Sequence, residues 1–126
     1  MKKPFESPRR EIGAFREILD EIGSRFSENI AFLWRDLTCE DGIAARTYAA
    51  LADDVRSLAA YLCAMGLQGR RIALCGKNSY LWVVSYLAIC CGCGTVVPLD
   101  RELSPASLAD LMNDAECAAV LYGEDI

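Results

Sequence analysis

Three segments of the chain carry residue types that could bind or transform a ligand. The first is the turn Gly76-Lys77-Asn78-Ser79, where free backbone N–H groups and a lysine at the start of a helix could hold a phosphate. A P-loop also needs a glycine five positions before Gly76, where this chain has Arg71, and a Ser or Thr after Lys77, where it has Asn78. We therefore expect a strand-to-helix turn with an Asn or Ser cap, and nucleotide binding remains the alternative.

The second segment is Gly92-Cys93-Gly94, which resembles the start of a dinucleotide-binding fingerprint. The third glycine of that pattern is replaced by Val97, and the segment leads into a strand instead of leaving one. We expect these glycines to end a helix tightly. Cys90 and Cys91 beside Cys93 raise a metal or redox hypothesis, but a helix C-terminus disfavours thiolates and no paired CxxC spacing is present, so packing is the preferred interpretation.

The third segment is the loop from Asp100 to Ser104, which follows a predicted strand. Ligands of open parallel sheets bind at the carboxyl ends of the strands, and Arg101 in this loop could meet a phosphate there. A charged loop that is only solvated is the alternative interpretation.

Composition excludes several classes of function. The 126 residues carry a net charge of −5, which argues against a general nucleic-acid-binding protein. No histidine is present, which removes the usual general base, the commonest zinc ligand and every Ser/His or Cys/His nucleophile pair. The seven cysteines are odd in number and mostly lie in apolar segments, and no secretory signal opens the chain, so we expect buried thiols in the cytoplasm.

The run of uncharged residues from Tyr80 to Leu99 must be either a membrane span or part of a soluble sheet. Gly92 and Gly94 interrupt it, and the residues that follow are β-branched and precede Pro98. A bilayer span needs one continuous helix of about 20 apolar residues. We therefore predict a helix followed by a short strand, and no transmembrane segment.

Hydrophobic periodicity and capping residues predict the order of elements along the chain. The first is an amphipathic helix over 8–26 that starts at Ser7 and Pro8 and packs on the sheet, with a membrane surface as the alternative. The others are strands over 30–35 and 43–47 joined through Asp41-Gly42, a helix over 48–65 capped by Thr47 and ended by Gly66, a strand over 72–75, a helix over 79–91, a strand over 95–99, a helix over 105–113 capped by Ser104, and a strand over 118–122.

Strands that alternate with crossover helices predict an α/β fold with a mostly parallel sheet, covered by helices on both faces. The expected organisation is an N-terminal helix in 1–28, a β-hairpin in 29–47 and α/β units in 48–126. The apolar face expected for the long helix consists of Tyr48, Leu51, Val55, Leu58, Leu62 and Met65.

The order of three sequence blocks resembles the amino-terminal part of the adenylate-forming enzymes, and most closely the long-chain fatty acyl-CoA synthetases. These blocks are ARTYAALADDVRSLAAYLCAMGLQGRRIAL, GKNSYLWVVSYLAI and GTVVPLDRELSPASLADLMNDAECAAVLY. The resemblance runs from about Phe15 to Tyr122. It implies the N-terminal subdomain of an AMP-binding domain, in an acid-thiol ligase that joins a carboxylate to ATP with the help of Mg²⁺ and then passes the acyl group to coenzyme A.

The resemblance also implies catalytic parts that no segment of this chain matches: a Ser/Thr/Gly-rich loop with its lysine, nucleotide-holding acidic residues and a mobile carboxyl-terminal domain. We therefore expect an amino-terminal fragment that is inactive alone, whose partner is the remainder of the same polypeptide and which self-associates through an unpaired sheet edge. The resemblance places a basic residue near the coenzyme A tunnel, here Arg101, displaced by one position from the family's Asn-Pro-Arg pattern. The alternatives are a free-standing flavodoxin-like binding module and an adenylation-domain fragment for another acid.

Overall fold

The structure, a computed structural model, describes residues 13–124. The expected cap Ser7 and first helical residue Pro8 lie outside this range. In chain order the elements are α1 (Phe15–Arg25), β1 (Ile30–Arg35), β2 (Ile43–Thr47), α2 (Tyr48–Ala64), β3 (Arg71–Cys75), α3 (Tyr80–Ala88), the π-helical turn η1 (Ile89–Cys93), β4 (Thr95–Leu99), α4 (Pro105–Asp114) and β5 (Ala119–Tyr122).

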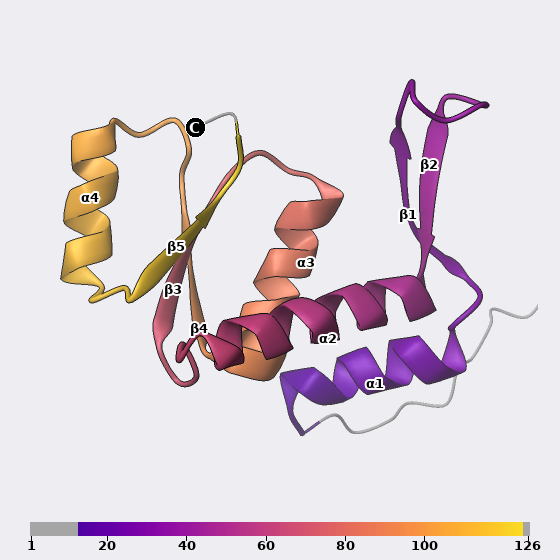
Figure 1. Cartoon of the computed structure of the whole chain (residues 1–126), viewed down its shortest axis with the longest axis horizontal. Coiled ribbons are helices and arrows are strands. Elements are labelled where there is room, and N and C mark those ends of the chain that lie inside the picture. The colour runs from indigo at the N-terminus through magenta and orange to yellow at the C-terminus, as the bar shows by residue number, and fades with distance from the viewer. Residues whose placement is uncertain (1–12, 125–126) are drawn as a thin grey trace, which may run out of the picture.

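Three strands form a parallel sheet in the order β4-β3-β5, which confirms the α/β fold class. The central strand β3 is aligned so that Ile72 lies between Val96 and Ala119. From β3 the chain passes through α3 to β4 on one side, and from β4 it crosses back past β3 through α4 to β5 on the other side. Right-handed crossovers in opposite directions place their helices on opposite faces, and α3 and α4 lie on opposite sides of the sheet (Figure 1).

Strands β1 and β2 form a separate antiparallel hairpin at the N-terminal end of α2, and α3 lies between the hairpin and the parallel sheet (Figure 1). The structure confirms the β-hairpin expected over 29–47, because β2 pairs with β1 and joins no strand of the parallel sheet. The parallel sheet therefore begins with β3.

The long helix α2 starts and ends where its capping residues predict. The Thr47 side chain accepts a hydrogen bond from Ala50 N, and Gly66 adopts the left-handed conformation with φ of 81°. The buried face of α2 differs from the expected one in two ways. Met65, at the end of the expected face, is 59% exposed, and two alanines that were not expected to be buried, Ala52 and Ala59, belong to the core. Its buried residues are Leu51, Ala52, Val55, Ala59 and Leu62.

Helix α1 differs from the prediction in its start and in what it covers. It begins at Phe15, and the Glu17 side chain in its first turn accepts a hydrogen bond from Gly13 N at 2.8 Å. It packs on α2 and η1 instead of on the sheet, since Leu19 joins the core cluster of α2. A Cβ on Gly23 would lie 2.9 Å from Ala52 Cβ, so glycine permits this close helix pairing.

The helix expected over 79–91 is α-helical only to Ala88 and then widens into η1. The Gly94 N–H bonds to the Ile89 carbonyl at 2.7 Å, a five-residue step, so the glycines end the helix with a wide turn and not the tight one we predicted. A Cβ on Gly94 would lie 2.2 Å from Arg70 O, which excludes other residues. None of the helices in residues 13–124 is long and apolar enough to span a bilayer.

Two clusters of buried side chains form the core. One joins α1, α2 and α3 around Val55, Val84 and Ala88. The other joins α2, η1 and the sheet around Leu62, Ile72 and Ile89. Strand β3 is buried from Ile72 to Cys75, whereas the edge strand β5 leaves Val120 37% and Tyr122 67% exposed. Helices therefore cover the centre of the sheet more fully than this edge.

Candidate functional site

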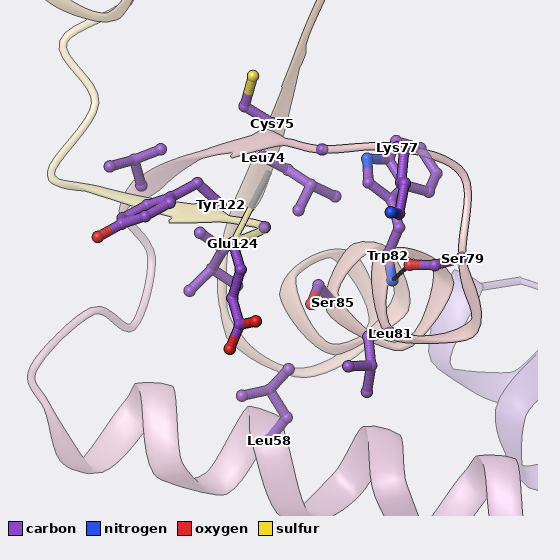
Figure 2. A pocket seen from close by; sticks show the side chains of 14 residues that line it. Leu58, Leu74, Cys75, Lys77, Ser79, Leu81, Trp82, Ser85, Tyr122 and Glu124 are labelled. Atoms are coloured by element: carbon purple, nitrogen blue, oxygen red, sulfur yellow. Dashed lines mark hydrogen bonds between the residues drawn. The ribbon is translucent and has the colours of Figure 1, made fainter. Parts of the chain in front are cut away.

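The carboxyl edge of the sheet borders an open pocket of about 850 Å³. The segments after β3 and β5 meet here, because parallel strands end at the same edge of a sheet. The turn after β3 contributes Lys77 and Ser79, and the end of the described chain contributes Glu124 (Figure 2). The structure thus brings the predicted residues Lys77 and Ser79 into one pocket.

The remaining walls of the pocket are mainly apolar. Leu74 of β3 points toward α3, and Leu58 of α2 closes the far side (Figure 2). The first two turns of α3 contribute Leu81, Trp82 and Ser85. Leu81 is 72% exposed although it is large and apolar. An apolar pocket with few polar groups is the usual form of a small-molecule site or of a surface that another segment covers.

The turn before α3 is a capped strand-to-helix turn, as its sequence predicts. Ser79 Oγ accepts a hydrogen bond from Trp82 N at 3.1 Å, which satisfies one of the free N–H groups of the helix. A Cβ on Gly76 would make only ordinary contacts, the nearest at 3.6 Å. This turn therefore does not need the close backbone approach for which phosphate loops require glycine.

An aromatic and charged cluster fixes the start of α3, and the sequence analysis missed it. The Tyr80 hydroxyl donates a hydrogen bond of 2.6 Å to Asp54 of α2, and the Trp34 ring of the hairpin stacks on the Tyr80 ring at 5.3 Å. The Arg46 guanidinium lies 5.8 Å from the centres of both rings. Burial, with the Asp54 carboxylate as a second cause, raises the pKa of Tyr80 well above its usual value. The β1–β2 hairpin thus contacts Tyr80, the residue that follows the helix cap Ser79, and fixes its position at the start of α3.

Arg101 lies outside the pocket that Lys77 and Ser79 line. Its guanidinium Nε is 3.2 Å from Glu102 Oε1, and its side chain is 41% exposed. The Asp100 side chain accepts a hydrogen bond from Glu102 N at 2.9 Å and orders the loop. Arg101 of the loop after β4 and Lys77 of the turn after β3 therefore do not line the same pocket.

The cysteines of η1 carry protonated thiols at neutral pH. Burial raises the pKa of Cys91 to about 12 and that of Cys93 to about 11. The Cys91 thiol donates to the Phe15 carbonyl at 3.8 Å, so it faces α1. Within residues 13–124, no three His, Cys, Asp or Glu side chains lie close enough together to hold a metal ion. The residues described here thus give no support to a metal centre.

Residues 19–125 match the model of a family described as AMP-binding enzyme, so the chain belongs to that family. Solved structures with the same fold include the N-terminal subdomain of NpsA from Klebsiella oxytoca, with a TM-score of 0.78 at 21% identity over 91% of this chain and 29% of that chain. A crystal structure of CmiS6 aligns with a TM-score of 0.76 at 26% identity over 97% of this chain and 29% of that chain.

A complex of VinN with L-aspartate also shares the fold, with a TM-score of 0.73 at 23% identity over 86% of this chain and 26% of that chain. The chain thus has the fold of an N-terminal subdomain found in adenylate-forming enzymes and spans less than a third of the length of these structures. No curated protein sequence matches it.

Proposed function

We propose that this chain forms the first part of a ligase that activates a carboxylic acid with ATP and releases pyrophosphate to leave an acyl-adenylate. The observation that carries the proposal is the family match over residues 19–125. This match favours an enzyme over a free-standing flavodoxin-like binding module, because it covers both crossover helices and the whole parallel sheet.

The chain's own role in this ligase is that of a scaffold. It supplies three parallel strands and the helices that cover them, and its partner is the remainder of the same polypeptide, which would cover the open edge at β5 and the apolar pocket beside it. We place this ligase in the cytoplasm. The exposed Leu81 and Tyr122 support the scaffold role, since large apolar side chains at one edge are typical of a surface that another segment covers.

For the acid and its acceptor, we propose a long-chain fatty acid and coenzyme A. The support is the resemblance of the sequence from about Phe15 to Tyr122 to the fatty acyl-CoA synthetases. In this proposal Arg101 lies near the coenzyme A tunnel of the whole enzyme. Its ion pair with Glu102 must then open or be shared when a phosphate of coenzyme A binds.

A second candidate is the activation of an aromatic or amino acid. Two of the similar structures favour it, because one NpsA structure is a complex with 3-hydroxyanthranilyl-AMSN and the VinN structure contains L-aspartate. At 21% and 23% identity these structures show the shared fold and leave the acid open.

We propose ATP, Mg²⁺ and coenzyme A as the cofactors and co-substrates of the whole enzyme. No cluster of three acidic, His or Cys side chains in residues 13–124 fits Mg²⁺. At the pocket, Ser79 is engaged as a helix cap and Lys77 is accompanied by the acidic Glu124. We therefore assign no step of the reaction to these residues. Millimolar ATP should leave the melting temperature of the 126-residue chain unchanged.

Acid-dependent exchange of pyrophosphate into ATP tests the proposed function. Protein from the complete reading frame should catalyse this exchange with palmitate and form palmitoyl-CoA when coenzyme A is added. Exchange with 3-hydroxyanthranilate or aspartate, and none with palmitate, would support the second candidate. No exchange with any carboxylic acid would overturn the proposal.

The Arg101→Ala variant of the same protein tests the role of this residue. It should raise the KM for coenzyme A while pyrophosphate exchange stays unchanged. A Glu116→Ala variant removes a different exposed ion pair, with Arg71 at 3.3 Å, and serves as the matched control. Equal loss of both half-reactions, or of neither, would contradict the assignment of Arg101.

A further inference from the structure

Two thiols lie together where α2 crosses η1, away from the pocket and its turns. Cys63 belongs to α2 and is half-buried, whereas Cys93 ends η1 and is 7% exposed. Both join the core cluster around Leu62 and Ile89. The two residues are 30 positions apart in the sequence, so the fold itself brings them together.

The contact between α2 and η1 is close at this point because of Gly92. A Cβ on Gly92 would lie only 2.7 Å from Ala59 Cβ, so the backbone of η1 rests directly on α2. Cys63 follows Ala59 by one helical turn and therefore shares its face of α2. The Cys63 thiol accordingly donates a hydrogen bond to Gly92 O at 3.5 Å, which places it beside Cys93, the next residue. Burial and then the neighbouring Cys63 thiol raise the pKa of Cys93.

The other cysteines of η1 face elsewhere. The Cys91 thiol donates to the carbonyl of Phe15 on α1, and the Cys90 thiol donates to the carbonyl of Leu87, one turn back in α3. Cys93 is therefore the η1 cysteine left to pair with Cys63, and Cys63 packs against the core cluster that contains Cys93. The choice of Cys93 over Cys90 and Cys91 as the partner of Cys63 thus follows from the contacts of these side chains, and not from their spacing in the sequence.

We propose that Cys63 and Cys93 are a peroxide-sensitive pair that closes reversibly to a disulfide between α2 and η1. Cys63 is the entry point, because it is the more exposed of the two. Its sulfur takes one oxygen from hydrogen peroxide to give a sulfenic acid and water. The Cys93 sulfur then attacks that sulfur, the S–O bond breaks, and the departing hydroxide takes the Cys93 proton to form a second water.

Two thiols thus supply the two electrons that reduce one peroxide, and a dithiol reductant reverses the reaction. The high pKa of Cys93 makes the second step slow at neutral pH and faster as the pH rises toward 11. The bond fixes η1 on α2 and closes a loop that contains β3 and α3, so the oxidised chain should resist unfolding.

Peroxide treatment of the 126-residue chain followed by alkylation and non-reducing peptide mass spectrometry tests the pair. The expected product is one intramolecular linkage between the peptides that carry Cys63 and Cys93. It should form faster at pH 9 than at pH 7, raise the melting temperature by several degrees, and disappear with dithiothreitol.

Two variants make the result specific. Cys63→Ser should remove both the linkage and the rise in melting temperature, and Cys117→Ser, which changes another half-buried cysteine, should retain both. A linkage of Cys63 to Cys90 or Cys91, linkage between two copies, or seven thiols that all stay unlinked would overturn the proposal. Linkage that forms only in urea would also overturn it, since the folded geometry would then play no part.

Discussion

The close contact between Gly92 and Ala59 predicts a measurable coupling between these positions. In Gly92→Ala the new Cβ would lie 2.7 Å from Ala59 Cβ, so α2 and η1 must move apart. Overpacking of this kind costs about 1–3 kcal/mol, and the better helix propensity of alanine recovers at most about 1 kcal/mol. We expect a net loss of about 1–2 kcal/mol in the free energy of unfolding.

The second change, Ala59→Gly, removes the atom that clashes. Alone it costs about 1 kcal/mol, because glycine destabilises a helix interior. In the double variant the clash is absent and alanine at position 92 keeps its helix propensity, so we expect a loss of at most about 1 kcal/mol and a favourable coupling equal to the overpacking cost of about 1–3 kcal/mol. The free energies of unfolding come from urea denaturation of the four proteins, compared through a double-mutant cycle.

Gly76→Ala is the matched control, since its Cβ would meet nothing closer than 3.6 Å. It should change the free energy of unfolding by less than about 0.5 kcal/mol. A double variant of Gly92 and Ala59 that is destabilised by the full sum of the two single changes would refute the reasoning. In that case the close contact would contribute nothing to the cost of a side chain at position 92.

Three further predictions concern other parts of the fold. Burial, and after it the hydrogen bond to Asp54, raises the pKa of Tyr80, so the protonated phenol stabilises the fold below the unfolded pKa near 10 and this stability should be lost as the pH rises above it. Tyr80→Phe should reduce that loss in urea titrations at pH 9 and 11. Since burial raises the pKa of Cys91 from 9.0 to about 12, iodoacetamide at pH 8 should modify it far more slowly in the folded than in the urea-unfolded chain. The 126-residue chain should self-associate at high concentration through β5, and Val120→Lys should reduce this in sedimentation experiments; a wild-type chain that stays monomeric would contradict it.

The sequence predicts best those features that depend on near neighbours. The caps Thr47, Ser79 and Ser104 each bond to an N–H three residues later, so the sequence alone identifies them. Gly66 likewise needs only its own backbone conformation to end α2. The alternation of strands and helices then limits the sheet to a parallel one, and the structure confirms it.

The wrong predictions concern contacts between distant segments. The wide turn η1 depends on Gly92 meeting Ala59 and Gly94 meeting Arg70, and periodicity carries no information on either contact. Helix α1 lies on α2 instead of the sheet because Gly23 permits close approach to Ala52. An amphipathic pattern reveals that a helix has a buried face, and it cannot identify the partner.

The candidate site was predictable in part. The sequence singled out the turn with Lys77 and Ser79 because it opens a helix, and in the structure both residues line the pocket at the carboxyl edge of the sheet. The pair of Tyr80 and Asp54 spans 26 positions and needed the fold to be seen. The ion pair of Arg101 with Glu102 joins adjacent residues, and the charged sequence of that loop was a sufficient signal.

The strand order β4-β3-β5 also determines how the sheet can be assembled during synthesis. The central strand β3 leaves the ribosome first, followed by β4 and then β5, so each new strand meets an edge that already exists. No strand has to be inserted between two paired neighbours. The chain can therefore build its sheet outward from the middle, in the direction in which it is translated.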